Sequence, residues 1–276
     1  MGQYSRPRAG RSPQSVCVAW QETASETFVA RHEERDAADV GAVLGQLEHA
    51  RDRFDERFPQ SPGELVVVMH GSGALLDAAA PWVPLQRRMT APAARRYLVG
   101  WAAERELHVL APRLLAQRAS NVEGSLELLM LAPAALLARR YVAANHRGMP
   151  PPLGPRRLAR WLRWAWLLEG AGQFFSGQVH HVRPAVTRRM REGGTPSFPP
   201  GRRDAPLLGG SVYDLLEREE GERACVALAC GPHRHGPRRA LEAAFGGRSL
   251  RETEAAWREH LERIAEPGGT RRRRRR

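Results

Sequence analysis

A single carboxylate, Glu169, lies inside the apolar stretch WAWLLEGAGQFFSGQ at residues 164–178. A buried, unpaired carboxylate is strongly destabilising, so a buried Glu169 needs a partner. Its side chain suits two kinds of chemistry, because a carboxylate can ligate a metal ion or act as a catalytic acid or base. The alternative without chemistry is a Glu on the solvent face of an amphipathic helix.

The other candidate metal ligands are poorly spaced. The stretch CVALACGPHRH contains four of them, Cys225, Cys230, His233 and His235. Residues five apart on a helix do not share a face, so we interpret the stretch as a helix end followed by a solvated loop. With Cys17 the chain has three cysteines, which does not indicate a disulfide framework. HGSGALL at 70–76 lacks the third glycine of a dinucleotide-binding loop and predicts a tight strand-to-helix turn.

The apolar periodicity predicts an α+β fold in which strands come first and helices follow. Strand patterns occupy residues 26–34, 64–70, 95–103 and 106–112. Helical repeats occupy residues 37–58, 121–144, 157–178, 211–229 with a break at Gly221, 237–245 and 250–264. Ser249 and Glu252 have the spacing of a capping box. Loops are predicted at 148–155, which is rich in Pro, and within 183–210.

Several of these segments resemble the peptidase MA-like gluzincin metallopeptidases. WLLEGAGQFFSG at 166–177 is similar to the family's WLxEG motif, whose Glu is the third zinc ligand. Further similar segments are GGSVYDLLEREEG at 209–221, AFGGRSLRETEAAWREHL at 244–261, APWVPLQ at 80–86 and the strand pair within 95–112. The resemblance implies one zincin-like domain at 17–265, with a mixed α/β lobe and a small sheet at 17–118 and an all-helical lobe at 119–265. A flexible Arg-rich arm at 1–16 and a disordered poly-Arg tail at 266–276 would flank it.

The same resemblance implies that the zinc site has been lost. The helix that carries HExxH in the family reads SLELLMLAPAALLARRYV here, at 125–142. This alignment places Ala132 and Leu136 at the two His positions and Pro133 at the catalytic Glu position. Ala and Leu offer no metal ligand, and Pro offers no general base. Pro133 is also expected to kink or restart the helix. Glu169 alone would survive, so we expect no catalytic residue, no zinc and no other cofactor.

Glu169, Gln173 and Tyr213 are expected to line the former cleft. Glu169 would then pair with an arginine, join a hydrogen-bond network or bind a cationic group. The Tyr213 hydroxyl either meets Glu169 or, as we favour, reaches the surface from an ordinary core position. A rebuilt metal site would have to recruit His146, His180 or His181, of which the adjacent pair is expected to be solvent-exposed.

The favoured interpretation is a catalytically inactive metallopeptidase-like protein that binds or scaffolds an unknown protein or peptide through the former cleft. One alternative is an active metallohydrolase or peptidase with non-standard ligands around Glu169. Another is a nucleic-acid-associated protein that works through its Arg-rich termini.

The distribution of charge weakens the nucleic-acid alternative. The net charge is +13, but Arg271 to Arg276 contribute six positive charges and the first sixteen residues three, so the body carries only +4. No apolar run is long enough to span a membrane. The N-terminus has no apolar segment of the kind found in secretory signals, and a cytoplasmic location is therefore expected.

Overall fold

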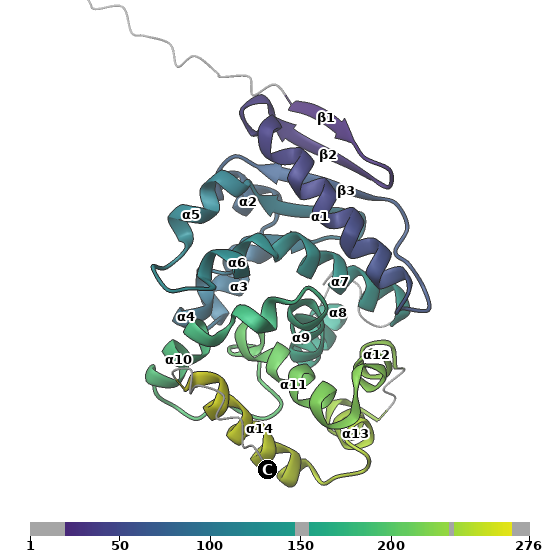
Figure 1. The fold of residues 1–276 in the computed structure, drawn as a ribbon, viewed down its shortest axis with the longest axis vertical. Coiled ribbons are helices and arrows are strands. Elements are labelled where there is room, and N and C mark those ends of the chain that lie inside the picture. Colours follow the sequence, from purple (N-terminus) through teal and green to yellow (C-terminus); the bar gives the residue numbers. More distant parts are fainter. Residues whose placement is uncertain (1–19, 147–154, 232–234, 267–276) are drawn as a thin grey trace, which may run out of the picture.

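The N-terminal part of the protein is built on a mixed sheet (Figure 1). The computed structural model describes residues 20–146, 155–231 and 235–266. The sheet has five strands, in the spatial order β1 (Trp20–Ala24), β2 (Phe28–Glu33), β3 (Leu65–His70), β5 (Glu106–Leu110) and β4 (Gly100–Ala102). The central strands β2, β3 and β5 run parallel, and the two edge strands are antiparallel to their neighbours. The rest of the described chain is mostly helical, which agrees with an α+β fold.

Two long helices, α1 (Ala37–Asp55) and α7 (Ala132–Asn145), pack against one face of the sheet. The Arg51 guanidinium of α1 lies 5.6 Å from the centre of the Phe28 ring on β2. A Leu136 methyl group of α7 lies so close to Gly100 on β4 that a Cβ there would meet it at 2.7 Å. Side chains alternate between the two faces of a strand. Trp101 is therefore directed to the opposite face, where it stacks on Trp82 of α3 (Trp82–Met89).

Shorter helices connect these elements and build the C-terminal region. In the N-terminal part they are α2 (Gly73–Ala79), α4 (Pro92–Arg95), α5 (Leu115–Arg118) and α6 (Ser125–Met130). In the C-terminal region they are α8 (Pro155–Arg163), α9 (Ala165–Phe175), α10 (Arg183–Arg191), α11 (Ala205–Glu220), α12 (Glu222–Cys230), α13 (Pro237–Ala244) and α14 (Leu250–Ala265). Three 3-10 turns, η1 (Glu34–Asp36), η2 (Pro112–Leu114) and η3 (Gln178–His181), complete the described elements.

The strand predictions are confirmed for the centre of the sheet and fail at its edges. The patterns at 26–34, 64–70 and 106–112 correspond to β2, β3 and β5. The edge strand β1 was not expected, because its sequence WQETA is exposed along its whole length and carries no apolar alternation. The strand expected at 95–103 shrinks to the three residues of β4, because Pro92 begins a helical turn that includes Arg95.

Two predicted helical segments are each divided into two helices, and the first of these breaks is the one expected at Pro133. The pattern at 121–144 is divided at Leu131 into α6 and α7, because Pro133 in the first turn of α7 has no N–H to donate to a preceding carbonyl. The start also moves to Ser125, since Gly124 has a φ of 87°. The pattern at 157–178 is divided into α8 and α9 at Trp164, and nothing in the local sequence explains that break.

The ends of the C-terminal helices follow their local sequence signals only in part. The break at Gly221 is confirmed, with a φ of 86°, and Ser249 and Glu252 form the expected capping box. α11 begins six residues earlier than the predicted Ser211, at Ala205, with Pro206 in its first turn. α10 lies in the segment where only loop was named. Of the loop expected at 148–155, Pro155 belongs to α8 and the other residues lie outside the described part.

Glycines let three helices approach closely around Glu169. A Cβ on Gly170 of α9 would lie 2.5 Å from the carbonyl oxygen of Gly209 on α11. A Cβ on Gly172 would lie 2.9 Å from the carbonyl oxygen of Ala135 on α7. The small residues after Glu169 therefore serve backbone packing, because any larger side chain would force the helices apart.

The described part of the chain forms one continuous hydrophobic core, which joins residues of the sheet, of α7 and of the C-terminal helices. The expected arm at 1–16 and the tail beyond Glu266 lie outside the described residues. None of the described helices has the length and apolar character needed to cross a membrane.

Candidate functional site

Glu169 lies in a buried ion-pair and hydrogen-bond cluster, and it is only 2% exposed. The amide Nε2 of Gln86, on α3, donates a hydrogen bond of 2.8 Å to its Oε1. The Nη2 atom of Arg139, on α7, lies 2.6 Å from its Oε2. This contact is an ion pair, although the N–H direction does not give an aligned hydrogen bond. The charge of Glu169 thus has a partner inside the protein, as its burial requires.

Two of the residues expected at the lost zinc site, Ala132 and Leu136, line a small cavity together with Arg139 and Gln173. Packing of α7 on α9 places Ala135 against Gly172 and Arg139 against Glu169, one helical turn beyond Leu136. The Leu136 side chain instead reaches Gly100 at the edge of the sheet. Pro133 is buried and lines a separate cavity on the other side of α7.

The space beside the cluster is small. A cavity of about 30 Å³ is lined by residues of β4, α7 and α9, including Leu136, Arg139 and Gln173. A volume of this size holds about one water molecule. The described structure therefore leaves little free space beside Glu169 and its partners.

Gln173 and Tyr213 have packing roles in this region. The Gln173 side chain accepts a hydrogen bond of 2.7 Å from the backbone N–H of Gly210 and donates one of 3.3 Å to the carbonyl oxygen of Ala205. Tyr213 is completely buried and stacks on Phe174, so the expected placement of its hydroxyl at the surface is wrong. Burial raises the pKa of Tyr213 far above its ordinary range. Among the described residues the hydroxyl has no hydrogen-bond partner, and it does not meet Glu169.

The described residues contain no group of three or more His, Cys, Asp or Glu side chains arranged to hold a metal ion. Cys225 is buried on α12 and Cys230 ends that helix. His233 lies outside the described part, so the candidate cluster at 225–235 is only partly described. His146 follows α7 and packs beside Trp164. His180 and His181 lie in η3, where His180 is exposed as expected and His181 is half-buried.

A second polar cluster lies on the sheet, away from Glu169. Nε2 of His70 and Nδ1 of His108 are 3.1 Å apart, and Nε2 of His108 lies 3.2 Å from the Glu106 carboxylate. Both imidazoles are buried, and burial lowers the pKa of His70 to about 4 and also lowers that of His108. The lowered pKa values keep both imidazoles neutral near pH 7, so the contact between His70 and His108 is a hydrogen bond between neutral rings.

A large open groove lies between α4, the start of α6, η3 and α10. It has a volume of about 950 Å³ and shares Tyr97 with the small cavity beside Arg139. Four arginines line it, Arg96, Arg183, Arg188 and Arg191, against two carboxylates, Glu123 and Glu127. Arg183, Arg188 and Arg191, all on α10, are exposed, so the groove presents a positive surface.

Sequence reasoning identified Glu169 but missed its two partners. Arg139 was detectable in principle, because it is one of two adjacent arginines on a mainly apolar helix and, of the two, is the one that lies three residues after Leu136, on the same face. Gln86 lies 83 residues before Glu169 and gave no local signal.

Comparison with known proteins gives no match: no family model, no curated protein and no solved structure is significantly similar to this chain. The resemblance to gluzincin metallopeptidases therefore stays a prediction from the sequence.

Proposed function

We propose that the protein is a non-catalytic binding protein with a metallopeptidase-like architecture, in which an arginine takes the place of the metal ion. The observation that carries the proposal is the contact between Arg139 and Glu169. A zinc ion bound to Glu169 Oε2 would lie about 2.0–2.2 Å from it. In this proposal the Arg139 guanidinium nitrogen, 2.6 Å from Oε2, supplies the positive charge that the ion would otherwise supply.

The proposal also follows from the surroundings of the pair. Gln86 donates a hydrogen bond to the other carboxylate oxygen of Glu169, and the adjoining cavity has room for about one water molecule. A hydrolytic site needs a metal-bound water or an activated nucleophile next to space for a scissile bond. The cluster around Glu169 offers neither, so its role in this account is to hold α3, α7 and α9 together.

We infer that partners bind at the open groove rather than beside Glu169, where there is room for about one water molecule. The groove is large enough for several residues of an extended peptide and adjoins the small cavity through Tyr97. Its exposed arginines, Arg183, Arg188 and Arg191, favour an acidic segment, because guanidinium groups pair with carboxylates in bidentate geometry. The proposed partner is therefore a protein that presents an acidic peptide segment.

Catalysis is tested by comparing hydrolysis of an unstructured protein, such as casein, by the purified protein and by Glu169→Gln in the presence of added zinc. We expect the same background rate for both, because no metal-bound water is formed. A rate for the native chain that is clearly higher and is lost in Glu169→Gln would overturn the inactive assignment. Circular dichroism of Glu169→Gln shows whether that variant is folded.

Binding is tested by fluorescence anisotropy with a labelled, Glu-rich peptide. Charge reversal of Arg183, Arg188 and Arg191 should weaken binding by about tenfold or more. The matched control reverses three exposed arginines outside the groove, Arg223, Arg238 and Arg251. Both variants keep Arg271 to Arg276, so any binding by that tail is common to them. Equal weakening in both variants would show that net charge, and not the groove, attracts the peptide.

A further inference from the structure

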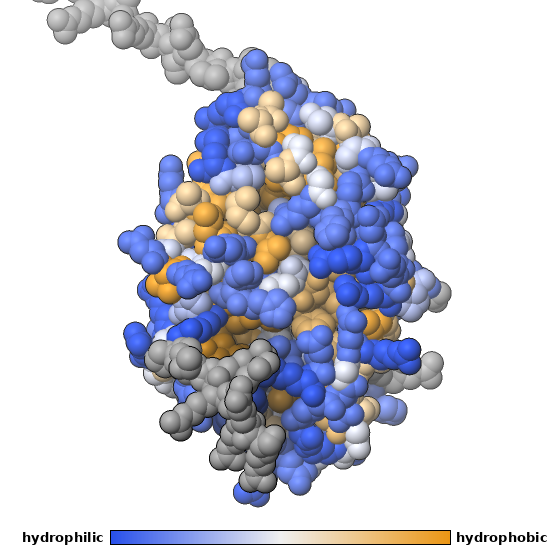
Figure 2. Space-filling model, in the orientation of Figure 1, coloured by the Kyte–Doolittle hydropathy of each residue, from blue (hydrophilic) through white to orange (hydrophobic). Residues whose placement is uncertain are grey.

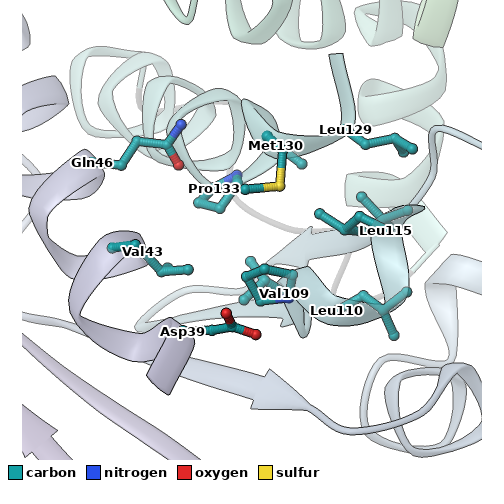
Figure 3. A pocket seen from close by; sticks show the side chains of 13 residues that line it. Asp39, Val43, Gln46, Val109, Leu110, Leu115, Leu129, Met130 and Pro133 are labelled. Atoms are coloured by element: carbon teal, nitrogen blue, oxygen red, sulfur yellow. The ribbon is translucent and has the colours of Figure 1, made fainter. Parts of the chain in front are cut away.

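An apolar cavity of about 200 Å³ lies between α1 and the junction of α6 with α7, above β5 (Figure 3). It is separate from the cluster around Glu169 and from the arginine groove, and neither proposal above uses it. Most of its lining is aliphatic, from Val43, Val99, Val109, Leu110, Leu115 and Leu129. Figure 2 shows apolar side chains gathered over α5 and α6, on the same side of the molecule.

The interruption of the helix at Leu131 explains why this space exists. A continuous helix over α6 and α7 would carry one straight apolar face along α1. Instead α6 ends at Met130 and α7 restarts at Ala132, and both Met130 and Pro133 line the cavity. Met130 is 39% exposed, so a flexible thioether stands at its opening.

The cavity carries a single charge, because Asp39 is the only ionisable side chain among its lining residues. Asp39 is half-buried in the first turn of α1, and its carboxylate points toward the β5 residues Val109 and Leu110 (Figure 3). Within the described residues it makes no hydrogen bond or ion pair. The helix dipole favours an acidic residue in the first turn, which explains why an Asp is tolerated at this position. The dipole does not place a positively charged side chain beside the carboxylate.

Gln46 supplies a second polar group on the same helix. It lies seven residues after Asp39, which is about 10 Å along an α-helix, and its amide can donate or accept a hydrogen bond. The cavity therefore has an aliphatic interior, an acid at one position and a neutral amide two turns away. An anionic amphiphile such as a fatty acid would place its carboxylate in this negative environment, which like-charge repulsion disfavours.

We propose that this cavity binds a small arylalkylamine, with the aromatic ring among the aliphatic side chains and the ammonium group beside Asp39. An apolar cavity of about 150 Å³ is large enough for benzene, so a phenyl ring fits here. The ammonium group would form a charge-assisted hydrogen bond with the carboxylate at the cavity edge. The inference is independent of the proposed function, because it involves no residue of the Glu169 cluster or of the groove.

The test uses the full-length protein and a matched pair of probes, 2-phenylethylamine and 2-phenylethanol, titrated by calorimetry or followed by ligand-observed NMR. The two probes share the phenyl ring and differ in charge. We expect the amine to bind about tenfold more tightly than the alcohol, because a hydrogen bond to a charged group contributes more than a neutral one. Equal binding of the two probes, or no binding of either up to about 10 mM, would overturn the proposal.

Four variants locate the site. Asp39→Asn should abolish the preference for the amine and leave alcohol binding unchanged, whereas Asp52→Asn, an exposed acid on the same helix, should change neither. Ala42→Trp places a large ring over the cavity and should abolish binding of both probes, whereas Ala38→Trp, exposed and outside the lining, should not. Preference for the amine that persists in Asp39→Asn, or binding that persists in Ala42→Trp, would contradict the assignment.

Discussion

Two carboxylates flank α7 in opposite situations. Glu169 is buried and is matched by a guanidinium and an amide, with room beside it for about one water molecule. Asp39 is half-buried, has no partner among the described residues, and borders an apolar cavity of about 200 Å³. A buried acid whose charge is neutralised internally stabilises the fold, whereas an unpaired acid beside an open cavity is available to a ligand. We therefore propose a structural role for Glu169 and a ligand-binding role for Asp39.

The largest effect is expected from breaking the buried pair. Arg139→Ala would leave Glu169 as an uncompensated buried charge and should lower the free energy of unfolding by about 3–5 kcal/mol. Urea denaturation measures the change. The control is Arg239→Ala, which breaks an exposed ion pair with Glu242 and should cost less than about 1 kcal/mol.

A double-mutant cycle makes that test sharper. Because Gln at position 169 carries no charge, Arg139→Met combined with Glu169→Gln should be less destabilising than the sum of the two single changes. Strict additivity would mean that the pair carries no interaction energy and that Glu169 is neutralised in another way.

Acid titration examines His70, a buried side chain that stays uncharged in the folded protein, whereas Glu169 has a charged partner. The pKa of His70 is lowered from 6.5 to about 4 in the folded protein, so the folded state favours the neutral imidazole. The contribution to stability is complete above pH 6.5 and is lost as the pH falls toward 4, by about 3 kcal/mol at most. His70→Gln should flatten the dependence of unfolding on pH in this range, and His49→Gln, at an exposed position of α1, should leave it unchanged.

Close helix packing is what brings Glu169 to its partners, and Gly170→Ala tests it. The added Cβ would meet the backbone of Gly209 at 2.5 Å, so the two helices must move apart, at a cost of about 2 kcal/mol. Gly45→Ala in α1, where a Cβ meets no atom within 4 Å, should be neutral or stabilising. Thermal unfolding of both variants checks the contrast.

The smallest effect is expected at the second carboxylate. Asp39→Asn should change the free energy of unfolding by less than about 1 kcal/mol, because the charge it removes interacts mainly with the helix dipole. A loss as large as that of Arg139→Ala, measured by the same urea denaturation, would show that Asp39 also has a structural partner.

The central strands and many helix positions could be predicted because local periodicity and capping determine them. β3 is a continuous apolar run, and the Ser249 cap depends only on residues within one turn. The edge strands β1 and β4 could not, because their pairing with neighbours far along the chain, and not their own composition, makes them strands.

The sequence predicted that Glu169 needs a partner, but it did not predict which residues provide one. The sequence showed that Glu169 needs a positive or hydrogen-bonding partner, and an arginine was one of the options it allowed. It did not show that α7 packs with Arg139, rather than Leu136, opposite Glu169, because that register depends on the contact of Gly172 with Ala135. The cavity at Asp39 gave no sequence signal at all, since it depends on several elements that are distant in the sequence meeting in space.

The most direct test of the account is to count zinc atoms per chain. The untagged protein is equilibrated with excess zinc, dialysed and analysed for metal, alongside Glu169→Gln. We expect less than about a tenth of an equivalent in both, because Glu169 is paired with the Arg139 guanidinium. About one equivalent in the native chain that is lost in Glu169→Gln would show that Glu169 is a metal ligand, and the central claim would be wrong.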